Sequence, residues 1–241
     1  MTGIAALAFA VAVAAALAQA VTGFGSALVI VPLLTLVIGP QAAVVSATGM
    51  SAIISIYVTV RIHHQVAWKR MLTVSLAAIL GMPLGLLALT RFSEKALTIL
   101  IGVVLLVLVA AILCGLHLPQ RWPIEAGVGF VSGGLLTSTG ANGPPIAAVF
   151  QAMRLPPVTF RATMLASLCV QDTVAIFGFG AVGGISLEVL IVLAAGLPGL
   201  LLGWWGGNRL FARFHPNQFR WVVLAMLIIS ALAAVAQAIL S

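Results

Sequence analysis

The sequence predicts an all-α integral membrane protein built as an inverted repeat of two halves, each with five apolar segments. Three observations support this fold class: the composition, the spacing of the apolar runs and the distribution of loop charge. Of the 241 residues, 63% are hydrophobic and only 6% are charged, whereas soluble domains carry roughly a quarter charged residues. This composition excludes a soluble globular fold. The apolar runs extend from end to end, so we expect a single polytopic transmembrane domain over residues 1–241.

Glycine/proline clusters and charged residues divide the chain into ten apolar segments. Most are long enough to cross the hydrocarbon core, which takes about 20 helical residues. We expect helices because lipid cannot satisfy unpaired backbone groups, and the alternating strands of a membrane barrel are absent. The segments cover residues 3–20, 23–38, 41–60, 71–90, 96–114, 123–139, 144–153, 158–182, 186–206 and 219–240.

The first segment, residues 3–20, ends in an Ala-Gln-Ala that resembles a signal-peptidase site. A secretory signal needs a basic region before its apolar stretch, and no Lys or Arg precedes Arg61. We therefore interpret this segment as the first structural helix.

An internal repeat with an offset of about 115 residues divides the chain into repeat 1, about residues 1–116, and repeat 2, about residues 120–241. The identities are few, and the second copy has one extra residue in its first motif. The matching motifs are Thr22-Gly23-Phe24-Gly25 with Thr139-Gly140-Ala141-Asn142-Gly143, Ala47-Thr48 with Ala162-Thr163, and Gly81-Met82-Pro83 with Gly196-Leu197-Pro198.

Loop charge tests this repeat independently. The loops 61–70 and 207–218 are rich in Lys and Arg, which predicts that both are cytoplasmic. Their counterparts in the other half, 183–188 and 91–95, carry little positive charge. With an odd number of segments per half, the second copy is inverted in the membrane, so that corresponding loops lie on opposite sides. The difference in positive charge between the corresponding loops agrees with this inversion. Inverted-topology repeats are typical of transporters.

Two interrupted segments are candidate binding motifs, one in each half. Glycine and proline break the helix, and a helix that restarts offers free N–H groups and the positive end of its dipole to an anion. Neighbouring Ser, Thr and Asn side chains add donors. The alternative is that small residues only allow close helix packing. The candidate binding residues are Thr22, Gly23, Gly25, Ser26, Thr137, Ser138, Thr139, Gly140, Asn142, Gly143, Pro144 and Arg161.

The segments on either side of each break could cross the membrane twice or form a re-entrant hairpin with its tip near the midplane. Both arrangements leave the flanking loops on one side, so loop charge does not distinguish them. The short segment 144–153 favours a hairpin or a broken helix in the second half.

Asp172 lies near the middle of segment 158–182, beside Gln171. A buried acid at this depth costs roughly 2.5–3.5 kcal/mol and usually marks an ion or proton path. We expect Asp172, with Gln171, to take up or release a proton as an anion moves. The alternative is a structural acid, protonated or paired with Arg. Arg161, near the start of the same segment, is either a counter-charge for the anion or an anchor at the membrane surface.

The sequences around the two breaks resemble those of a known family. The stretch QAVTGFGSALVIVPLL (19–34) resembles the first signature of the sulfite exporter TauE/SafE family. GFVSGGLLTSTGANGPPIAAVF (129–150), followed by FRATML (160–165), resembles its second. The resemblance spans essentially the whole chain and implies a multi-pass permease of the bacterial inner membrane for sulfite, organosulfonates or related anions. Its motif positions fall on Thr22, Gly23, Gly25, Pro32, Gly140, Gly143, Pro144, Pro145 and Arg161, while Asn142 and Thr137-Ser138-Thr139 look particular to a subgroup.

We therefore predict a secondary transporter or exporter of a small sulfur-containing anion, with a proton as the candidate coupling ion. A passive anion channel could share this architecture. An intramembrane enzyme is less favoured, because the Gly-x-Gly-Ser of Gly23–Ser26 lacks a histidine base inside any apolar segment. We expect no catalytic residue, metal site, cofactor or nucleic-acid partner. The expected partners are the anion, the coupling proton and the lipid bilayer, and the sequence allows a homodimer.

Overall fold

The computed structural model describes residues 2–91 and 121–240, and every regular element in these ranges is a helix. The predicted segment 96–114 lies outside the described residues. Each of the other predicted segments corresponds to one helix. The helices are α1 (Thr2–Thr22), α2 (Ser26–Ile38), α3 (Pro40–Ile62), the short 3-10 helix η1 (His63–Gln65), α4 (Trp68–Arg91), α6 (Trp122–Thr139), α7 (Gly143–Ala152), α8 (Pro157–Ala181), α9 (Leu187–Phe211) and α10 (Pro216–Leu240).

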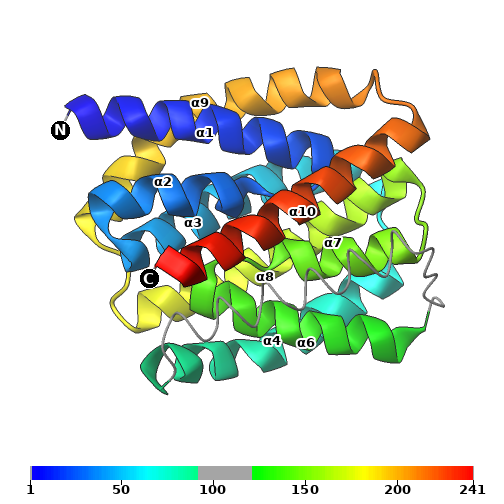
Figure 1. The fold of residues 1–241 in the computed structure, drawn as a ribbon, viewed down its shortest axis with the longest axis horizontal. Coiled ribbons are helices and arrows are strands. Elements are labelled where there is room, and N and C mark those ends of the chain that lie inside the picture. The colour runs from blue at the N-terminus through cyan, green and yellow to red at the C-terminus, as the bar shows by residue number, and fades with distance from the viewer. Residues whose placement is uncertain (1, 92–120, 241) are drawn as a thin grey trace.

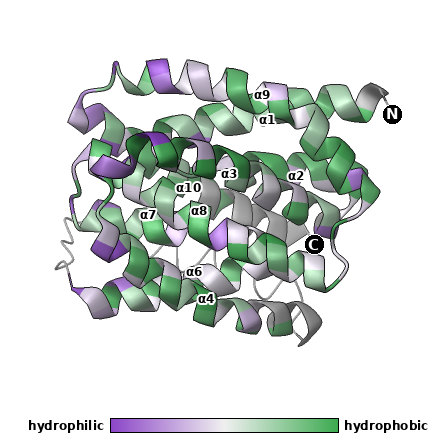
Figure 2. Ribbon diagram, turned by 180° about the vertical axis from the view of Figure 1, so that it is seen from behind, coloured by the Kyte–Doolittle hydropathy of each residue, from purple (hydrophilic) through white to green (hydrophobic). Residues whose placement is uncertain are grey.

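The outer surface of the bundle confirms the prediction of a membrane protein. Within the described residues, four helical stretches are long and apolar enough to cross a membrane: Ile4–Thr22, Gln41–Gln65, Pro157–Ala181 and Leu187–Phe211. Large apolar side chains such as Leu36 and Phe177 are exposed on helix surfaces, where lipid can cover them. Many of the most hydrophilic residues gather at one end of the bundle, where loops join the helices (Figure 2).

Two helix pairs form opposite edges of the molecule (Figure 1). Along one edge α1 lies beside α9, and the glycines Gly199 and Gly203 face the backbone at Phe9 and Val13. Residue numbers rise together along the contact, so the two helices run parallel. Small residues at such positions let two backbones approach closely within a membrane.

The pair α4 and α6 forms the other edge in the same way. Gly129 faces the backbone of Val74, and Gly133 faces that of Ala78. These two helices are therefore also parallel and tightly packed. Each edge thus joins the first helix of one predicted half to the fourth helix of the other half.

The centre of the bundle is formed by α3 and α8, which pack against each other between the two edges. Both helices bury polar groups: α3 buries hydroxyl groups, and α8 buries hydroxyl, amide and carboxyl groups. The buried polar residues here are Ser46, Thr48, Ser51 and Ser55 on α3 and Thr163, Ser167, Gln171 and Asp172 on α8.

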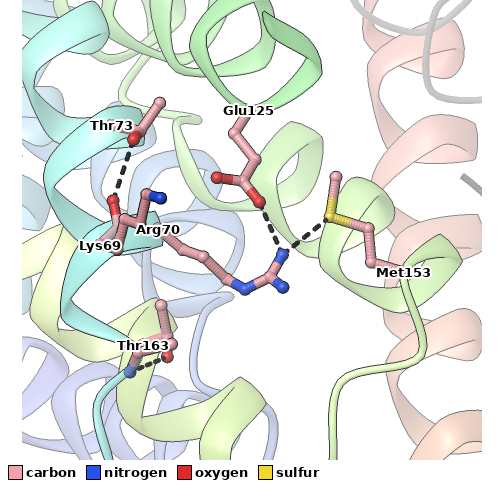
Figure 3. A network of polar contacts seen from close by, with 7 residues as sticks. Lys69, Arg70, Thr73, Glu125, Met153 and Thr163 are labelled. Atoms are coloured by element: carbon pink, nitrogen blue, oxygen red, sulfur yellow. Dashed lines mark hydrogen bonds and ion pairs between the residues drawn. The ribbon is translucent and has the colours of Figure 1, made fainter. Parts of the chain in front are cut away.

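A polar network fixes the end of the bundle where α4, α6 and α8 begin (Figure 3). Arg70 Nη1 lies 2.6 Å from Glu125 Oε1, which joins the first turn of α4 to the first turn of α6. The backbone N–H of Ala67 donates to Thr163 Oγ1 at 3.0 Å and links the loop before α4 to α8. These contacts place the η1 loop at the amino-terminal end of α8.

Candidate binding site between two helix breaks

The first break separates α1 from α2. Gly23 and Gly25 have φ values of 84° and 96°, a left-handed conformation that glycine adopts without steric cost. The hydroxyl of Thr22 lies 2.8 Å from Ala18 O and 2.7 Å from Phe24 O, so it binds the backbone around the turn. Gly23 lies against α8, where a Cβ would be 3.1 Å from Met164 Cβ.

The second break separates α6 from α7. Gly140 ends α6 with a φ of 75°, and its N–H donates to Leu136 O at 2.9 Å. Gly143 begins α7 and is followed by Pro144 and Pro145. Proline suits the first turn of a helix, because its fixed φ is helical and its missing N–H has no acceptor there.

The two breaks meet inside the bundle. Gly143 packs against Phe24 so closely that a Cβ on Gly143 would lie 2.8 Å from Phe24 Cβ. Beside this contact is a pocket with about 330 Å³ of empty space, including the part that opens to its surroundings. The start of α2 (residues 25–28) and the second break (residues 140–144) both line it. The two motifs predicted to act together are therefore side by side.

The central helices complete the pocket. Thr48 and Ser51 contribute from α3, and Asp172 contributes from α8. Asp172 is 1% exposed, and it is the one titratable side chain among the described residues that line the pocket. The structure thus places the predicted coupling acid next to both helix breaks.

Asn142 connects the second break to α8. Its Nδ2 lies 3.1 Å from Asp172 Oδ1 and 3.3 Å from Gln171 Oε1, so its two N–H groups are both engaged. The hydroxyl of Ser132 on α6 lies 2.9 Å from Asn142 O and 3.1 Å from Gln171 Oε1. Ser132 did not stand out in the sequence, because it is one small residue within a run of Gly and Val.

One oxygen of the Asp172 carboxyl remains without a hydrogen bond. Asp172 Oδ2 is buried and has no hydrogen bond among the described residues, although the Ser51 hydroxyl on α3 lies close enough to interact with the carboxyl group. More than nine in ten buried polar groups in proteins have a partner, so an exception needs an explanation such as an ion, a proton or a ligand. The Asp172 carboxyl group, which lines the pocket, can hold and release a proton.

Several predicted site residues lie behind the pocket rather than in its lining. Thr137 Oγ1 donates to Met82 O at 2.8 Å, Ser138 Oγ to Gly134 O at 2.8 Å, and Thr139 Oγ1 to Leu135 O at 3.0 Å. These hydroxyl groups, like that of Thr22, donate their protons to backbone carbonyl oxygens. Gly23 also lies outside the lining, and Gln171 reaches the pocket only through Asn142.

The backbone of Arg161 packs against Gly23 at the first break, but its side chain is directed toward α9. It is 6% exposed, and its Nη2 donates to Asn208 Oδ1 at 2.8 Å. The guanidinium carbon lies 4.7 Å from the ring centre of Trp204 and 4.3 Å from that of Phe211, both on α9. Arg161 precedes Asp172 by eleven residues, about 16 Å along the helix axis. The structure therefore does not bring it to the pocket.

Gln19 supports the pocket from α1. Its Nε2 lies 3.2 Å from Ser51 Oγ and 3.1 Å from Ser55 Oγ, which ties α1 to α3. Ser51 in turn lines the pocket. Neither Ser51 nor Thr48 was among the predicted site residues, since only knowledge of which face of α3 meets α8 identifies them.

Comparison with known proteins gives one match. The model of a family described as sulfite exporter TauE/SafE matches residues 8–234, which include both helix breaks and Asp172. No curated protein and no solved structure matches the chain.

Proposed function

The chain belongs to the sulfite exporter TauE/SafE family, and from this membership we propose that it is a secondary transporter of a small sulfur-containing anion. Sulfite and organosulfonates are the proposed substrates, and the bacterial inner membrane is the proposed location. The observation that carries the proposal is that two helix breaks, far apart in the sequence, line one pocket together with a buried acid.

The packing of the edges supports an inverted repeat with alternating access. α1 packs in parallel on α9, and α6 packs in parallel on α4. Two halves related by inversion would exchange contacts in this reciprocal way. Transporters of this kind hold their substrate where the repeats meet and rock one part against another.

The lengths of α2 and α7 support re-entrant hairpins. α7 has 10 residues and α2 has 13, about 15 and 20 Å of helix, whereas the hydrocarbon core is about 30 Å thick. We therefore propose that α2 and α7 return from the breaks without crossing the hydrocarbon core on their own, although α1 before the first break is long enough to cross it.

We propose that Asp172 couples transport to a proton. An anion in the pocket would be repelled by an ionised carboxylate, so it can enter only when Asp172 is neutral. Proton binding at Oδ2 and anion binding would then favour each other. Cys169, one turn earlier on α8, is a second titratable side chain close to this carboxyl group among the described residues.

Flux measurements in proteoliposomes test the proposed function. We expect uptake of radiolabelled methanesulfonate, an organosulfonate whose charge does not change with pH, to saturate and to be stimulated by unlabelled methanesulfonate on the opposite side. Asp172→Asn, whose side chain cannot ionise, should lose the dependence on a pH gradient. Glu188→Gln, an acid exposed at the start of α9, is the matched control and should keep it. A linear, non-saturating flux would instead indicate a passive channel.

A further inference from the structure

We infer that the two helix breaks differ in function. The amino end of α2 alone binds a monovalent oxyanion, whereas the second break, at the amino end of α7, binds and positions Asp172. This inference rests on the proposed function, because it takes the pocket between the breaks as the transport site. The sequence repeat would suggest two equivalent breaks, but the hydrogen-bond donors available at each are not equivalent.

The amino end of α2 offers a cluster of free donors. Ser26, Ala27 and Leu28 are its first three residues, and all three line the pocket. No side chain among the described residues caps this end. The N–H groups of a first helical turn have no acceptor within the helix, and the helix dipole adds about half a positive charge. The Ser26 hydroxyl adds a further donor.

The amino end of α7 has few donors. Its second and third residues are Pro144 and Pro145, which have no N–H, so only Gly143 offers one in the first three positions. Both N–H groups of Asn142 are engaged with Gln171 and Asp172. Gln171 Nε2 has no acceptor among the described residues, but Gln171 does not line the pocket.

The pocket is therefore polarised. Free backbone donors lie on the α2 side, whereas Asp172 is bound to Asn142 at the second break. No Lys or Arg is found among the described residues of the lining. A single helix end compensates about half a charge, which is too little for a dianion that must also share the site with a carboxyl group. The chemistry that fits is a monovalent oxyanion with its charged oxygens directed at α2.

Reciprocal proline exchanges test this assignment. Ala27→Pro places proline at the second position of α2, the position that Pro144 occupies in α7. The change removes one N–H, and the helix can still begin at the same residue because proline is tolerated in the first turn. Pro144→Ala is the converse change. Ser26→Ala removes one hydroxyl and leaves the backbone unaltered, so it also reports if Ala27→Pro does not fold.

Methanesulfonate is a suitable probe, because its single charge does not change with pH. We expect its dissociation constant, measured by calorimetry on the purified protein at one acidic pH, to rise roughly tenfold or more in Ala27→Pro and roughly threefold to tenfold in Ser26→Ala. Sulfate, a dianion of similar size, should bind at least tenfold more weakly than methanesulfonate to the unmodified protein.

The contrast between the variants decides the outcome. The inference holds if Ala27→Pro weakens binding at least tenfold more than Pro144→Ala does. It is overturned if the two variants weaken binding by similar factors, if Ser26→Ala leaves binding unchanged, or if sulfate binds as tightly as methanesulfonate. If the unmodified protein binds neither methanesulfonate nor sulfite, the proposed function fails and the inference fails with it.

Discussion

At the scale of single residues, Asn142 is the side chain that joins the second break to the acid on α8. Asn142→Ala would leave Asp172 Oδ1 without its donor, and a buried acceptor left unpaired costs about 1–3 kcal/mol. We expect a loss of that size in the free energy of unfolding, measured by denaturation in detergent. Ser138→Ala is the control, because its hydroxyl bonds only to carbonyls of its own helix. An equal loss in both variants would contradict the importance of the Asn142 link.

Gly23 is the second residue for which the structure predicts a measurable cost. A side chain there must adopt a φ of 84° and also press against Met164 and the backbone of Arg161. Gly183 has a φ of 73° but nothing within 4 Å of a Cβ. The free energy of unfolding should therefore fall by only about 1–2 kcal/mol in Gly183→Ala, which is the cost of the left-handed conformation. It should fall by more in Gly23→Ala. Equal melting temperatures for the two variants would show that the turn is not packed against α8 as described.

The sequence predicted part of this site and missed part of it for a physical reason. Glycine and proline mark helix breaks in apolar runs, and a lone acid within a span is conspicuous. The predicted residues that line the pocket are therefore Gly25, Ser26, Gly140, Asn142, Gly143, Pro144 and Asp172. Hydroxyl groups could not be assigned in this way. Ser and Thr in a helix can donate to carbonyls of the preceding turn, as Ser138 and Thr139 do here. Composition does not distinguish such a hydroxyl from one that faces a ligand.

At the scale of helices, glycine positions decide how closely the edge pairs pack. A Cβ at Gly203 would clash with the carbonyl of Val13 on α1, whereas one at Gly206 would meet nothing within 4 Å. We expect Gly203→Ala to lower the free energy of unfolding by about 1–3 kcal/mol. Gly206→Ala should leave it unchanged or raise it by up to about 1 kcal/mol, because alanine favours the helix. Denaturation of both variants in the same detergent makes the comparison.

The other edge offers the same comparison and tests whether both pairs are tight. Gly133 faces the carbonyl of Ala78 on α4, and Gly127 on the same helix faces open space. Gly133→Ala should destabilise the protein and Gly127→Ala should not. If only one edge responds in this way, the reciprocal packing of the two halves is not supported.

Helix partners were beyond the reach of the sequence. The spacing of Gly199, Gly203 and Gly207 shows that one face of α9 accepts a close neighbour, but it does not say which helix that is. The end of α9 was also placed too early, at residue 206, because the apolar run stops there. The helix continues to Phe211, since Gly207 packs against Ala20 of α1 and Asn208 binds Arg161. Tertiary contacts here extend a helix beyond its apolar pattern.

At the scale of the whole molecule, two loops that are far apart in the sequence lie at the same end. The η1 loop is held near the start of α8 by the bond from Ala67 to Thr163, and the end of α9 is held there by the bond from Arg161 to Asn208. Both loops are flanked by basic residues, which favours a cytoplasmic location for each. The loop between α8 and α9 follows the opposite end of α8. The all-helical membrane fold is confirmed, whereas the inversion of the halves stays a prediction.

Cysteine labelling tests that inversion. In a variant without Cys114 and Cys169, single cysteines replace His64, His215 or Val182, which are all exposed. We expect a membrane-impermeant maleimide to label positions 64 and 215 only in inside-out vesicles and position 182 only in intact cells, because α8 separates them across the bilayer. Labelling of positions 64 and 215 from opposite sides would mean that the halves are not inverted. The two helix breaks would then not be related by the inverted repeat on which the proposed alternating access rests.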